Sequence, residues 1–421
     1  MKKFIKITVM LLIINSAFII QYSTAQWIEQ FDAQEVLQDI EFINLNTGWA
    51  CGRNGLIFKT SNGGKNWSEQ INPSTGMGKT LYSIHPIDSH IVYSVGWFET
   101  ILKTTNGGTN WTAIRNGPWG EGSSYFATFF INGNTGWIVG SGYKILKTTN
   151  GGLTLDSIFF GATYIRDMYF RNSLEGVLCG EGGIVKKTTN GGLNWFGINI
   201  PLNGVLYNFT NISFIDDKYG WVIGRSRPVF YTTDFGYNWD SIGLVDEADL
   251  IYCHWFTSRL IGYCGGSYAK MFKTTDGGYT WRQQEDGIAN GFFTTFWFYN
   301  DSIGWTSGAG KILHTTTGGA YLVNINNNQN EIPDNFTLHQ NYPNPFNSQT
   351  TIEFDIKRKG DYSLVIYDCL GRKRDEVFSQ YLNAGSYSVS FNGDELQSGV
   401  YFYRLSADGN VVETRKMALI K

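Results

Sequence analysis

A short phrase that recurs along this chain constrains its fold more than any other feature. The phrase is Lys-Thr-Thr-Asn-Gly-Gly-Xaa-Asn-Trp, and one complete copy runs from Lys103 to Trp111. The first Thr of successive copies is Thr60, Thr104, Thr148, Thr188, Thr232, Thr274 and Thr315. The copies are therefore 40 to 44 residues apart, and a regular period of that length is typical of solenoids, arrays and β-propellers.

The residues of the phrase predict a strand, a tight turn and a second strand that starts at the Trp. Paired Thr residues favour extended backbone. The Asn or Asp can accept a hydrogen bond from the backbone two residues on, and the Gly that follows supplies positive φ. The same oxygens could bind calcium, but calcium takes about six to eight oxygen ligands and each turn offers one such side chain. We therefore interpret the turns as architecture.

Each repeat is expected to hold four antiparallel strands. In the first repeat these are residues 37–43, 48–52 and 56–61, and a fourth strand that begins at Trp67. A four-stranded unit of about 40 residues is a propeller blade, whereas solenoids of this period use helices, and no segment shows helical periodicity. Seven copies predict an all-β fold with a seven-bladed β-propeller over residues 26–323.

The ends of the repeat array suggest how the ring closes. The seventh phrase lacks its Trp, and a strand starting at Trp27 has no earlier strands of its own. We expect that strand to complete the seventh blade, although residues 321–324 could form a strand at the other end. Closure would remove the exposed strand edges of an open array.

A second domain is expected after a polar, non-periodic linker at residues 324–335. Residues 336–421 alternate between apolar and polar side chains in several runs, which predicts a small Ig-like antiparallel β-sandwich. The expected strands are residues 351–356, 362–367, 386–391, 400–405 and 412–420.

The N-terminus predicts export from the cytoplasm. In residues 1–25, three Lys residues precede an apolar run at 7–20 and small residues at 23–25, which is the pattern of a cleaved signal peptide. A retained membrane anchor is the alternative, but the apolar run is short for a span. The net charge of −3 gives no global attraction to nucleic acid, so no nucleic-acid partner is expected.

The cysteines and histidines do not predict a metal site. Five Cys residues in an exported chain leave at least one unpaired or intermolecular. Cys51 and Cys179 occupy matching repeat positions far apart around the ring, which favours buried free thiols, whereas Cys253 and Cys264 flank one predicted hairpin and could form a disulfide. There is no Cys/His cluster with zinc spacing, so we expect no metal and no cofactor.

The repeats resemble those of a known propeller family. Residues 48–60, Gly-Trp-Ala-Cys-Gly-Arg-Asn-Gly-Leu-Ile-Phe-Lys-Thr, are similar to the photosystem II assembly/stability-factor-like repeats of the Asp-box propellers. The resemblance covers residues 27–323 and implies the fold. It leaves function open, because sialidases, xyloglucan-cleaving glycosidases and sortilin-type receptors share the same turn box. A photosynthetic role does not follow for a secreted chain.

The C-terminal domain resembles the type A sorting domain of the type IX secretion system. The resemblance rests on residues 366–368 with Gly371 and Arg372, on 398–405, on 416–421 and on a proline-rich motif. The sorting-motif residues are Asn341, Tyr342, Pro343, Asn344, Pro345, Phe346, Asn347, Gly399 and Tyr401. The resemblance implies type IX secretion machinery and a sortase-like peptidase as partners. It also implies a secreted or outer-membrane surface location.

Candidate binding residues follow from the expected blade geometry. Propellers bind ligands at the central channel and on the face formed by the loops between the second and third strands (b–c loops) and between blades (d–a loops). The b–c candidates are Arg53, Trp97, Glu99, Tyr143, Glu181, Arg225, Arg227 and Tyr268. The d–a candidates are Arg115, Trp119, Glu121, Asp246, Glu247 and Asp249.

Two functions remain open from the sequence. The first is a non-enzymatic propeller that binds a protein or glycan, since Trp, Tyr and Arg side chains suit hot-spot contacts; the resembling assembly factors hold a protein partner with Arg on the propeller face. The alternative is a secreted glycoside hydrolase. A sialidase-like site would use Arg53, Arg166 and Arg225 to hold a carboxylate, and a paired-acid site would use two of Glu99, Asp167 and Glu181. We assign no catalytic residues.

Overall fold

The computed structural model describes residues 27–319, 333 and 335–421, except for residues 119, 121, 143, 162–163, 199, 203–204, 206, 226–227, 246–247, 249, 285–290, 383 and 394–395. The predicted signal peptide and the alternative closing strand at 321–324 lie outside these residues. Within the described chain, none of the helices has the length and apolar character needed to cross a membrane.

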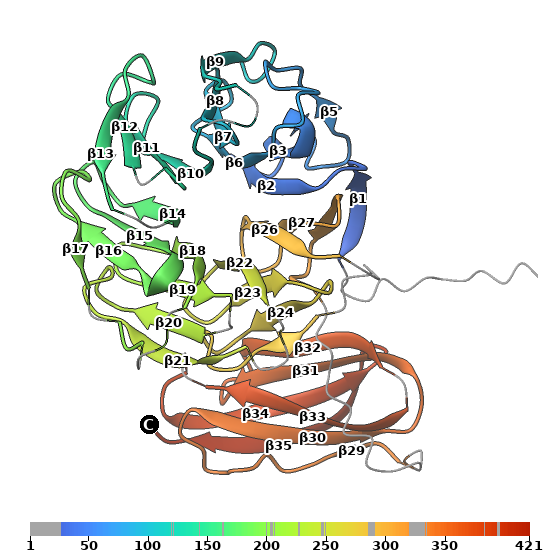
Figure 1. Cartoon of the computed structure of the whole chain (residues 1–421). Helices are drawn as coiled ribbons and strands as arrows, with labels where there is room; N and C mark the ends of the chain where they lie inside the picture. Colours follow the sequence, from blue (N-terminus) through green and yellow to red (C-terminus); the bar gives the residue numbers. More distant parts are fainter. Residues whose placement is uncertain are drawn as a thin grey trace, which may run out of the picture.

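Seven four-stranded antiparallel sheets of the described chain form a closed ring of blades (Figure 1). The innermost strands are β2 (Leu37–Phe42), β6 (Leu81–Pro86), β10 (Tyr125–Phe130), β14 (Ile165–Phe170), β18 (Phe209–Phe214), β22 (Ile251–Phe256) and β26 (Phe293–Phe298). Each contacts the innermost strands of the neighbouring blades, and β26 contacts β2. The predicted seven-bladed propeller is therefore confirmed.

The second strands of the blades occupy equivalent positions, and the first of them has its predicted bounds, residues 48–52. They are β3 (Gly48–Gly52), β7 (Val92–Gly96), β11 (Gly136–Gly140), β15 (Gly176–Gly180), β19 (Gly220–Gly224), β23 (Gly262–Gly266) and β27 (Gly304–Gly308). The third strands are β4 (Ile57–Thr60), β8 (Thr100–Thr104), β12 (Lys144–Thr148), β16 (Val185–Thr188), β20 (Pro228–Thr232), β24 (Met271–Thr274) and β28 (Lys311–Thr315).

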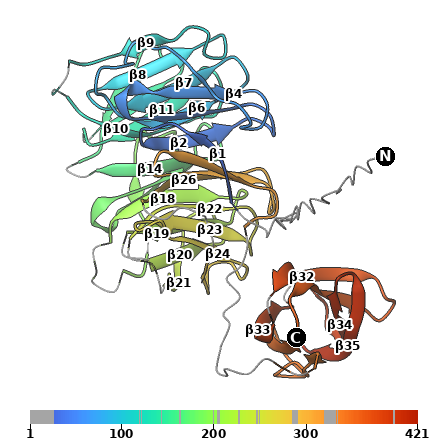
Figure 2. The ribbon, with the colours of Figure 1, turned by 90° about the vertical axis from the view of Figure 1, so that its right-hand side faces the viewer.

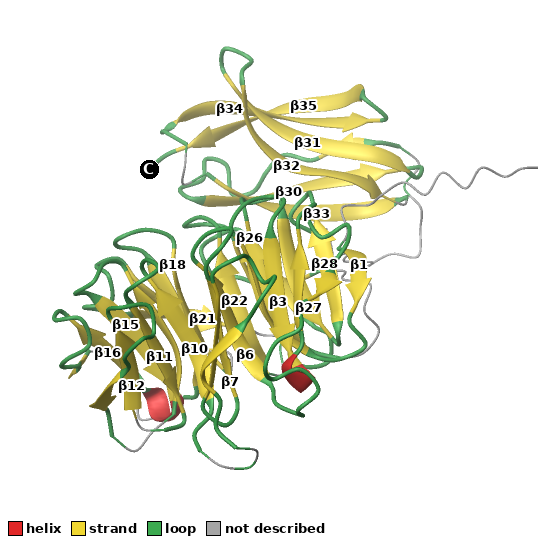
Figure 3. Ribbon diagram, turned by 90° about the horizontal axis from the view of Figure 1, so that it is seen from above, coloured by secondary structure: helices red, strands yellow, loops and turns green. Residues whose placement is uncertain are grey.

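The outer strands confirm how the ring closes. They are β5 (Ser68–Glu69), β9 (Thr112–Arg115), β13 (Asp156–Phe159), β17 (Phe196–Gly197), β21 (Asp240–Leu244), β25 (Arg282–Gln283) and β1 (Ile28–Asp32). β1 follows directly after Trp27 and pairs with β28, so the first strand of the described residues completes the seventh blade. The helical segments of the described chain are two short 3₁₀ turns, η1 (Arg53–Gly55) and η2 (Glu181–Gly183), which are red in Figure 3.

Aromatic stacking joins one blade to the next. The Trp at the second position of β11, Trp137, is fully buried and stacks on Phe170 of the following blade at 3.6 Å between ring centroids. The same stacking joins Trp221 to Phe256 and, across the ring closure, Trp305 to Phe42. Gly176 is required beside the Trp137–Phe170 stack, because a Cβ there would lie 2.6 Å from the Phe170 ring.

The repeated phrase also joins neighbouring blades. Thr104 accepts a hydrogen bond from the Gly108 backbone, and the Asn106 side chain accepts one from the backbone of Asn110. The Asn thus bonds four residues on, and our expectation of two residues was wrong. Lys103 donates to the Gly151 carbonyl of the next blade at 2.8 Å. The equivalent residues Lys59, Lys147, Lys187 and Lys273 make the same kind of bond.

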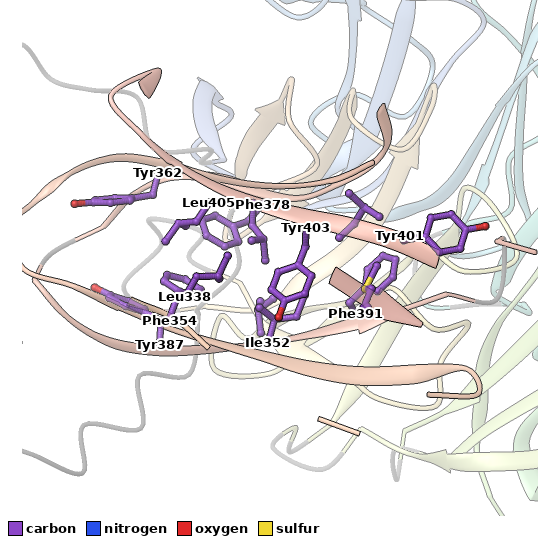
Figure 4. Packing of buried hydrophobic residues seen from close by; sticks show 14 of the residues in the cluster. Leu338, Ile352, Phe354, Tyr362, Phe378, Tyr387, Phe391, Tyr401, Tyr403 and Leu405 are labelled. Atoms are coloured by element: carbon purple, nitrogen blue, oxygen red, sulfur yellow. The ribbon is translucent and has the colours of Figure 1, made fainter. Parts of the chain in front are cut away.

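The C-terminal domain is a β-sandwich of two facing sheets, as predicted. One sheet contains β29 (Thr337–Leu338), β30 (Gln349–Ile356) and β33 (Gly385–Asn392), and the other contains β32 (Lys373–Leu382), β31 (Gly360–Asp368), β34 (Gly399–Ala407) and β35 (Asn410–Leu419). Figure 2 shows the domain end-on, with β33 on one side and β34 and β35 on the other. The core between the sheets includes Phe354, Tyr387 and Tyr403 (Figure 4).

The sequence missed two strands of this sandwich. β29 is only two residues long, and β32 begins with the charged residues 373–376 at a sheet edge. Charged residues are typical of edge strands, where they discourage pairing with other chains. They also obscure the alternation by which a strand is recognised.

Candidate functional site

A central channel runs through the propeller and forms a cavity of 350 Å³. The innermost strand of each blade carries an irregularity in register near its start; in β2 it lies between Leu37 and Asp39. Such a bulge breaks the two-residue alternation of side chains. As a result, the second and fifth residues of each inner strand are partly exposed and line the channel.

The second residues of the inner strands lie at the b–c mouth, because β2 begins opposite the end of β3. These residues are Gln38, Tyr82, Phe126, Arg166, Thr210, Tyr252 and Thr294. Of these residues, only Arg166 was predicted from the sequence as a candidate site residue. One signal in the sequence could have identified this position. The second residue of the inner strand varies from blade to blade, whereas the buried residues on either side of it are mostly apolar.

Aromatic rings gather on one side of the b–c mouth. The Trp97 indole donates a hydrogen bond to the Tyr82 hydroxyl at 2.7 Å, and Tyr82 packs edge-on against Phe126, with 5.4 Å between ring centroids. Burial raises the pKa of Tyr82, while the Trp97 hydrogen bond and the nearby charges of Arg166 and Arg53 partly offset the rise. Trp97 and Arg53 were both predicted site residues.

An arginine and a glutamate lie beside these rings. The Arg166 guanidinium is 4.3 Å from the centroid of the Phe126 ring and 5.7 Å from that of Tyr164. Arg166 also pairs with Glu181, to which its Nε donates a hydrogen bond at 3.1 Å. The predicted residue Glu181 is therefore at the mouth, held by an arginine that also contacts the aromatic cluster.

The other predicted loop residues are spread around the same face. The Arg225 guanidinium is 5.5 Å from the centroid of the Tyr252 ring. Glu99 lies 3.4 Å from Arg115, which also donates to the Tyr125 hydroxyl at 3.1 Å. Tyr268 is 74% exposed.

Several predicted loop residues fall outside the described part of the chain. They are Trp119, Glu121, Tyr143, Arg227, Asp246, Glu247 and Asp249.

Two carboxylates inside the channel have structural hydrogen bonds. Asp39 accepts from the Ile84 backbone of the next blade at 3.0 Å and from the Thr295 hydroxyl at 3.0 Å. Asp167 accepts from the Ile212 backbone in the same way at 3.0 Å. Burial, with a further contribution from Glu41, raises the pKa of Asp39 to about 7; burial raises that of Asp167 to about 6.

The described cysteines are all free, which answers the question left open for Cys253 and Cys264. Both are buried, as are Cys51 and Cys179, and burial raises the pKa of each of these thiols. Cys369 is exposed. The described residues contain no group of three or more His, Cys, Asp or Glu side chains placed to bind a metal.

The sorting motif divides into anchored and exposed residues. Asn341 is buried and donates to the Thr350 hydroxyl at 2.9 Å, and Phe346 is buried in the sandwich core. Tyr401 is also buried, and its hydroxyl donates to the Gln397 carbonyl at 2.8 Å. The motif residues left exposed are Tyr342, Pro343, Asn344, Pro345, Asn347 and Gly399.

The fold and site thus define a seven-bladed β-propeller followed by a C-terminal β-sandwich, and two family models agree. Residues 20–115 and 160–250 match the photosynthesis system II assembly factor YCF48. Residues 340–421 match the secretion system C-terminal sorting domain, which marks the protein for type IX secretion to the cell surface or the medium. No curated protein matches the sequence.

Solved structures share the propeller fold. YCF48 bound to a D1 peptide is 20% identical, with a TM-score of 0.58 over 69% of this chain and 96% of that one. YCF48 from Cyanidioschyzon merolae is 19% identical, with a TM-score of 0.56 over 69% and 98%. Virginiamycin B lyase from Staphylococcus aureus is 11% identical, with a TM-score of 0.58 over 69% and 98%. Because a lyase shares the fold, the fold alone does not separate binding from catalysis.

Proposed function

We propose that the propeller is a non-enzymatic binding module that takes a protein or glycan partner at the b–c mouth of its channel. On this proposal the type IX machinery exports the chain, and a sortase-like peptidase removes residues 336–421. The observation that carries the proposal is the cluster of Tyr82, Trp97, Phe126 and Arg166 at the mouth.

The chemistry of the cluster suits recognition. Aromatic rings supply large contact areas with little conformational entropy to lose, and Trp, Tyr and Arg are the residues most enriched at binding hot spots. The contacts among Trp97, Tyr82 and Phe126 hold the rings in place before a partner arrives, which lowers the cost of association. The peptide-bound YCF48 structure supports a protein partner in general terms.

The carboxylates named for hydrolysis are otherwise engaged. Glu181 pairs with Arg166, Glu99 lies beside Arg115, and Asp167 accepts backbone hydrogen bonds. A paired-acid mechanism instead needs one acid free to protonate the leaving group and a second free to activate water or attack.

A binding array tests the proposal. The mature protein and an Arg166→Gln/Tyr252→Ala variant would be screened against glycans and bacterial surface proteins. We expect partners that bind the mature protein and lose about tenfold or more in affinity with the variant. Leu153→Ser is the matched control and should bind normally. Leu153 is exposed in the Asn-Gly-Gly turn of the third repeat, which we call an Asp-box turn. Equal loss in both variants would contradict the assignment of the b–c mouth.

A secreted glycoside hydrolase is the second candidate. It is favoured by the raised pKa values of Asp39 and Asp167 in the channel, because carboxylates with raised pKa values often act as general acids. A panel of dye-labelled polysaccharides and sialosides tests this function. If the protein hydrolyses one of these substrates and Asp167→Asn abolishes the hydrolysis, the protein is a hydrolase and the binding proposal is wrong.

A further inference from the structure

The channel has a second mouth on the face that carries the Asp-box turns, which we call the Asp-box face. None of the matched families assigns a role to the residues that line this mouth. It is formed by the fifth residue of each inner strand, and we name this set the aromatic collar. Its members are Glu41, His85, Phe129, Tyr169, Ser213, Trp255 and Trp297. All are partly exposed and line the 350 Å³ cavity.

The collar residues contact one another across blade boundaries. On one side His85 lies 5.3 Å from Phe129, and Phe129 lies 5.4 Å from Tyr169, measured between ring centroids. On the other side Trp255 lies 6.4 Å from Trp297. Rings from five blades therefore line the channel at one level.

The collar carries one carboxylate that is open to solvent. Glu41 lies 3.2 Å from His85, yet its side chain remains 29% exposed. Burial lowers the pKa of His85, but the charge and hydrogen bond of Glu41, the hydrogen bond with the Phe130 carbonyl and the charge of Asp39 together outweigh burial and raise it. Glu41 thus contributes a negative charge, paired with His85, to a collar whose other members are Ser213 and four aromatic residues.

The two ends of the channel differ in charge. Arg166 lies at the b–c end, whereas Glu41 lies at the collar, with Asp39 and Asp167 between them. After burial, the charge of Glu41 contributes to the raised pKa values of both Asp39 and Asp167. A positive charge entering from the collar end would therefore meet an attractive potential.

We propose that the collar binds a lysine or arginine side chain of a protein partner. The charged head reaches Glu41 while the alkyl stem packs against the aromatic walls. Cations bind favourably over the faces of Trp, Tyr and Phe rings, and Lys and Arg side chains combine an apolar stem with a charged end. The cavity is in the size range of small-ligand sites, about 300–1,000 Å³.

The border of the collar favours a protein side chain over a free ammonium ion. The turns that follow the inner strands expose Leu45, Leu174 and Tyr299 at the same end of the channel, and these are 36%, 56% and 53% exposed. An apolar border of this kind offers contact to the backbone and neighbouring residues of a partner. This site is separate from the b–c mouth and does not depend on the function proposed there.

Short capped peptides provide the test. Calorimetric titration of the mature protein would compare Gly-Lys-Gly, Gly-Arg-Gly and the neutral Gly-norleucine-Gly, with tetramethylammonium and a neutral oligosaccharide as further probes. We expect the two cationic peptides to bind about tenfold or more tightly than the norleucine peptide. Tetramethylammonium, which lacks the stem, should also bind about tenfold more weakly than the lysine peptide.

A pair of substitutions on one strand locates the binding site. Trp255 and Tyr252 lie at opposite ends of β22, so Trp255→Leu should weaken the lysine peptide about tenfold while Tyr252→Leu leaves it within about twofold. Glu41→Gln should also weaken it about tenfold, and thermal unfolding would establish that each variant is folded. The proposal is overturned if the norleucine peptide or tetramethylammonium binds as tightly as the lysine peptide. It is also overturned if the oligosaccharide displaces the lysine peptide, or if Tyr252→Leu lowers the affinity for that peptide more than Trp255→Leu does.

Discussion

The two ends of each blade are built in different ways. At the Asp-box end the same contacts recur, as when Thr60, Thr104 and Thr148 each accept a hydrogen bond from a Gly backbone four residues on. At the b–c end the first residue of the loop varies, with five residue types in the seven blades. In order these are Arg53, Trp97, Ser141, Glu181, Arg225, Ser267 and Ala309.

The difference separates structural from functional residues. Contacts such as that of Lys103 with Gly151 join each blade to the next, and a closed ring of similar blades needs similar interfaces. Residues such as Trp97 and Arg225 do not join blades through the repeated phrase, so they can differ among repeats. Loops released from packing in this way are where binding residues concentrate.

The largest effect is expected from the inter-blade stack. Trp137→Ala would remove a fully buried ring that stacks on Phe170 and donates to the Gly191 carbonyl at 3.0 Å. We expect a loss of about 3–5 kcal/mol in the free energy of unfolding, measured by urea denaturation. Trp97→Ala at the mouth is the matched control and should cost about 1 kcal/mol. Equal costs would contradict the division between the two ends.

A pH-dependent effect is expected from Asp39. Its pKa is raised from 3.8 to about 7, chiefly by burial and then by Glu41. Between pH 3.8 and about pH 7 the folded protein keeps the Asp39 proton, whereas the unfolded chain has lost it. The free energy of unfolding therefore falls as the pH rises through this range. Asp39→Asn removes the dependence. Between pH 4 and pH 8 the free energy of unfolding of the variant should rise by about 2–4 kcal/mol relative to that of the parent protein. If the two proteins have parallel pH profiles, the pKa of Asp39 is not raised by folding.

A smaller loss is expected at a single Asp-box turn. Thr104→Val leaves the Gly108 backbone N–H without the acceptor it has at 2.9 Å. Because that N–H is buried, the substitution should cost about 2 kcal/mol. Thr112→Val removes an exposed hydroxyl of the same repeat and should cost less than about 0.5 kcal/mol. Thermal unfolding of both variants measures the difference, and a harmless Thr104→Val would mean that the turn does not need its threonine.

The smallest effect on stability is expected at the b–c mouth. Arg225 is exposed, and its guanidinium contacts the Tyr252 ring. Arg225→Ala should change the free energy of unfolding by less than about 0.5 kcal/mol. It should also lower the affinity for the partner found by the binding array about tenfold. Unfolding and binding measured on the same sample distinguish the two effects. A large loss of stability would make Arg225 a structural residue.

The sequence predicted the blades well but predicted the channel poorly. The second strand of the first blade, residues 48–52, was predicted with its observed bounds, since its glycines and turns are local signals. Tyr82 and Trp255 were missed because they reach the channel through a bulge that replaces the two-residue alternation with a spacing of three. Arg166 and Glu181 were considered separately, although the fold pairs them.

Repetition alone determined that this chain forms seven similar four-stranded units, because turn glycines, strand-forming threonines and alternating apolar residues act over a few neighbouring positions. The sorting motif likewise determined the export route. Only the tertiary structure decided which side chains share a surface. Tyr82 and Tyr252 belong to different blades, and they line one channel because ring closure brings together strands that lie far apart along the chain.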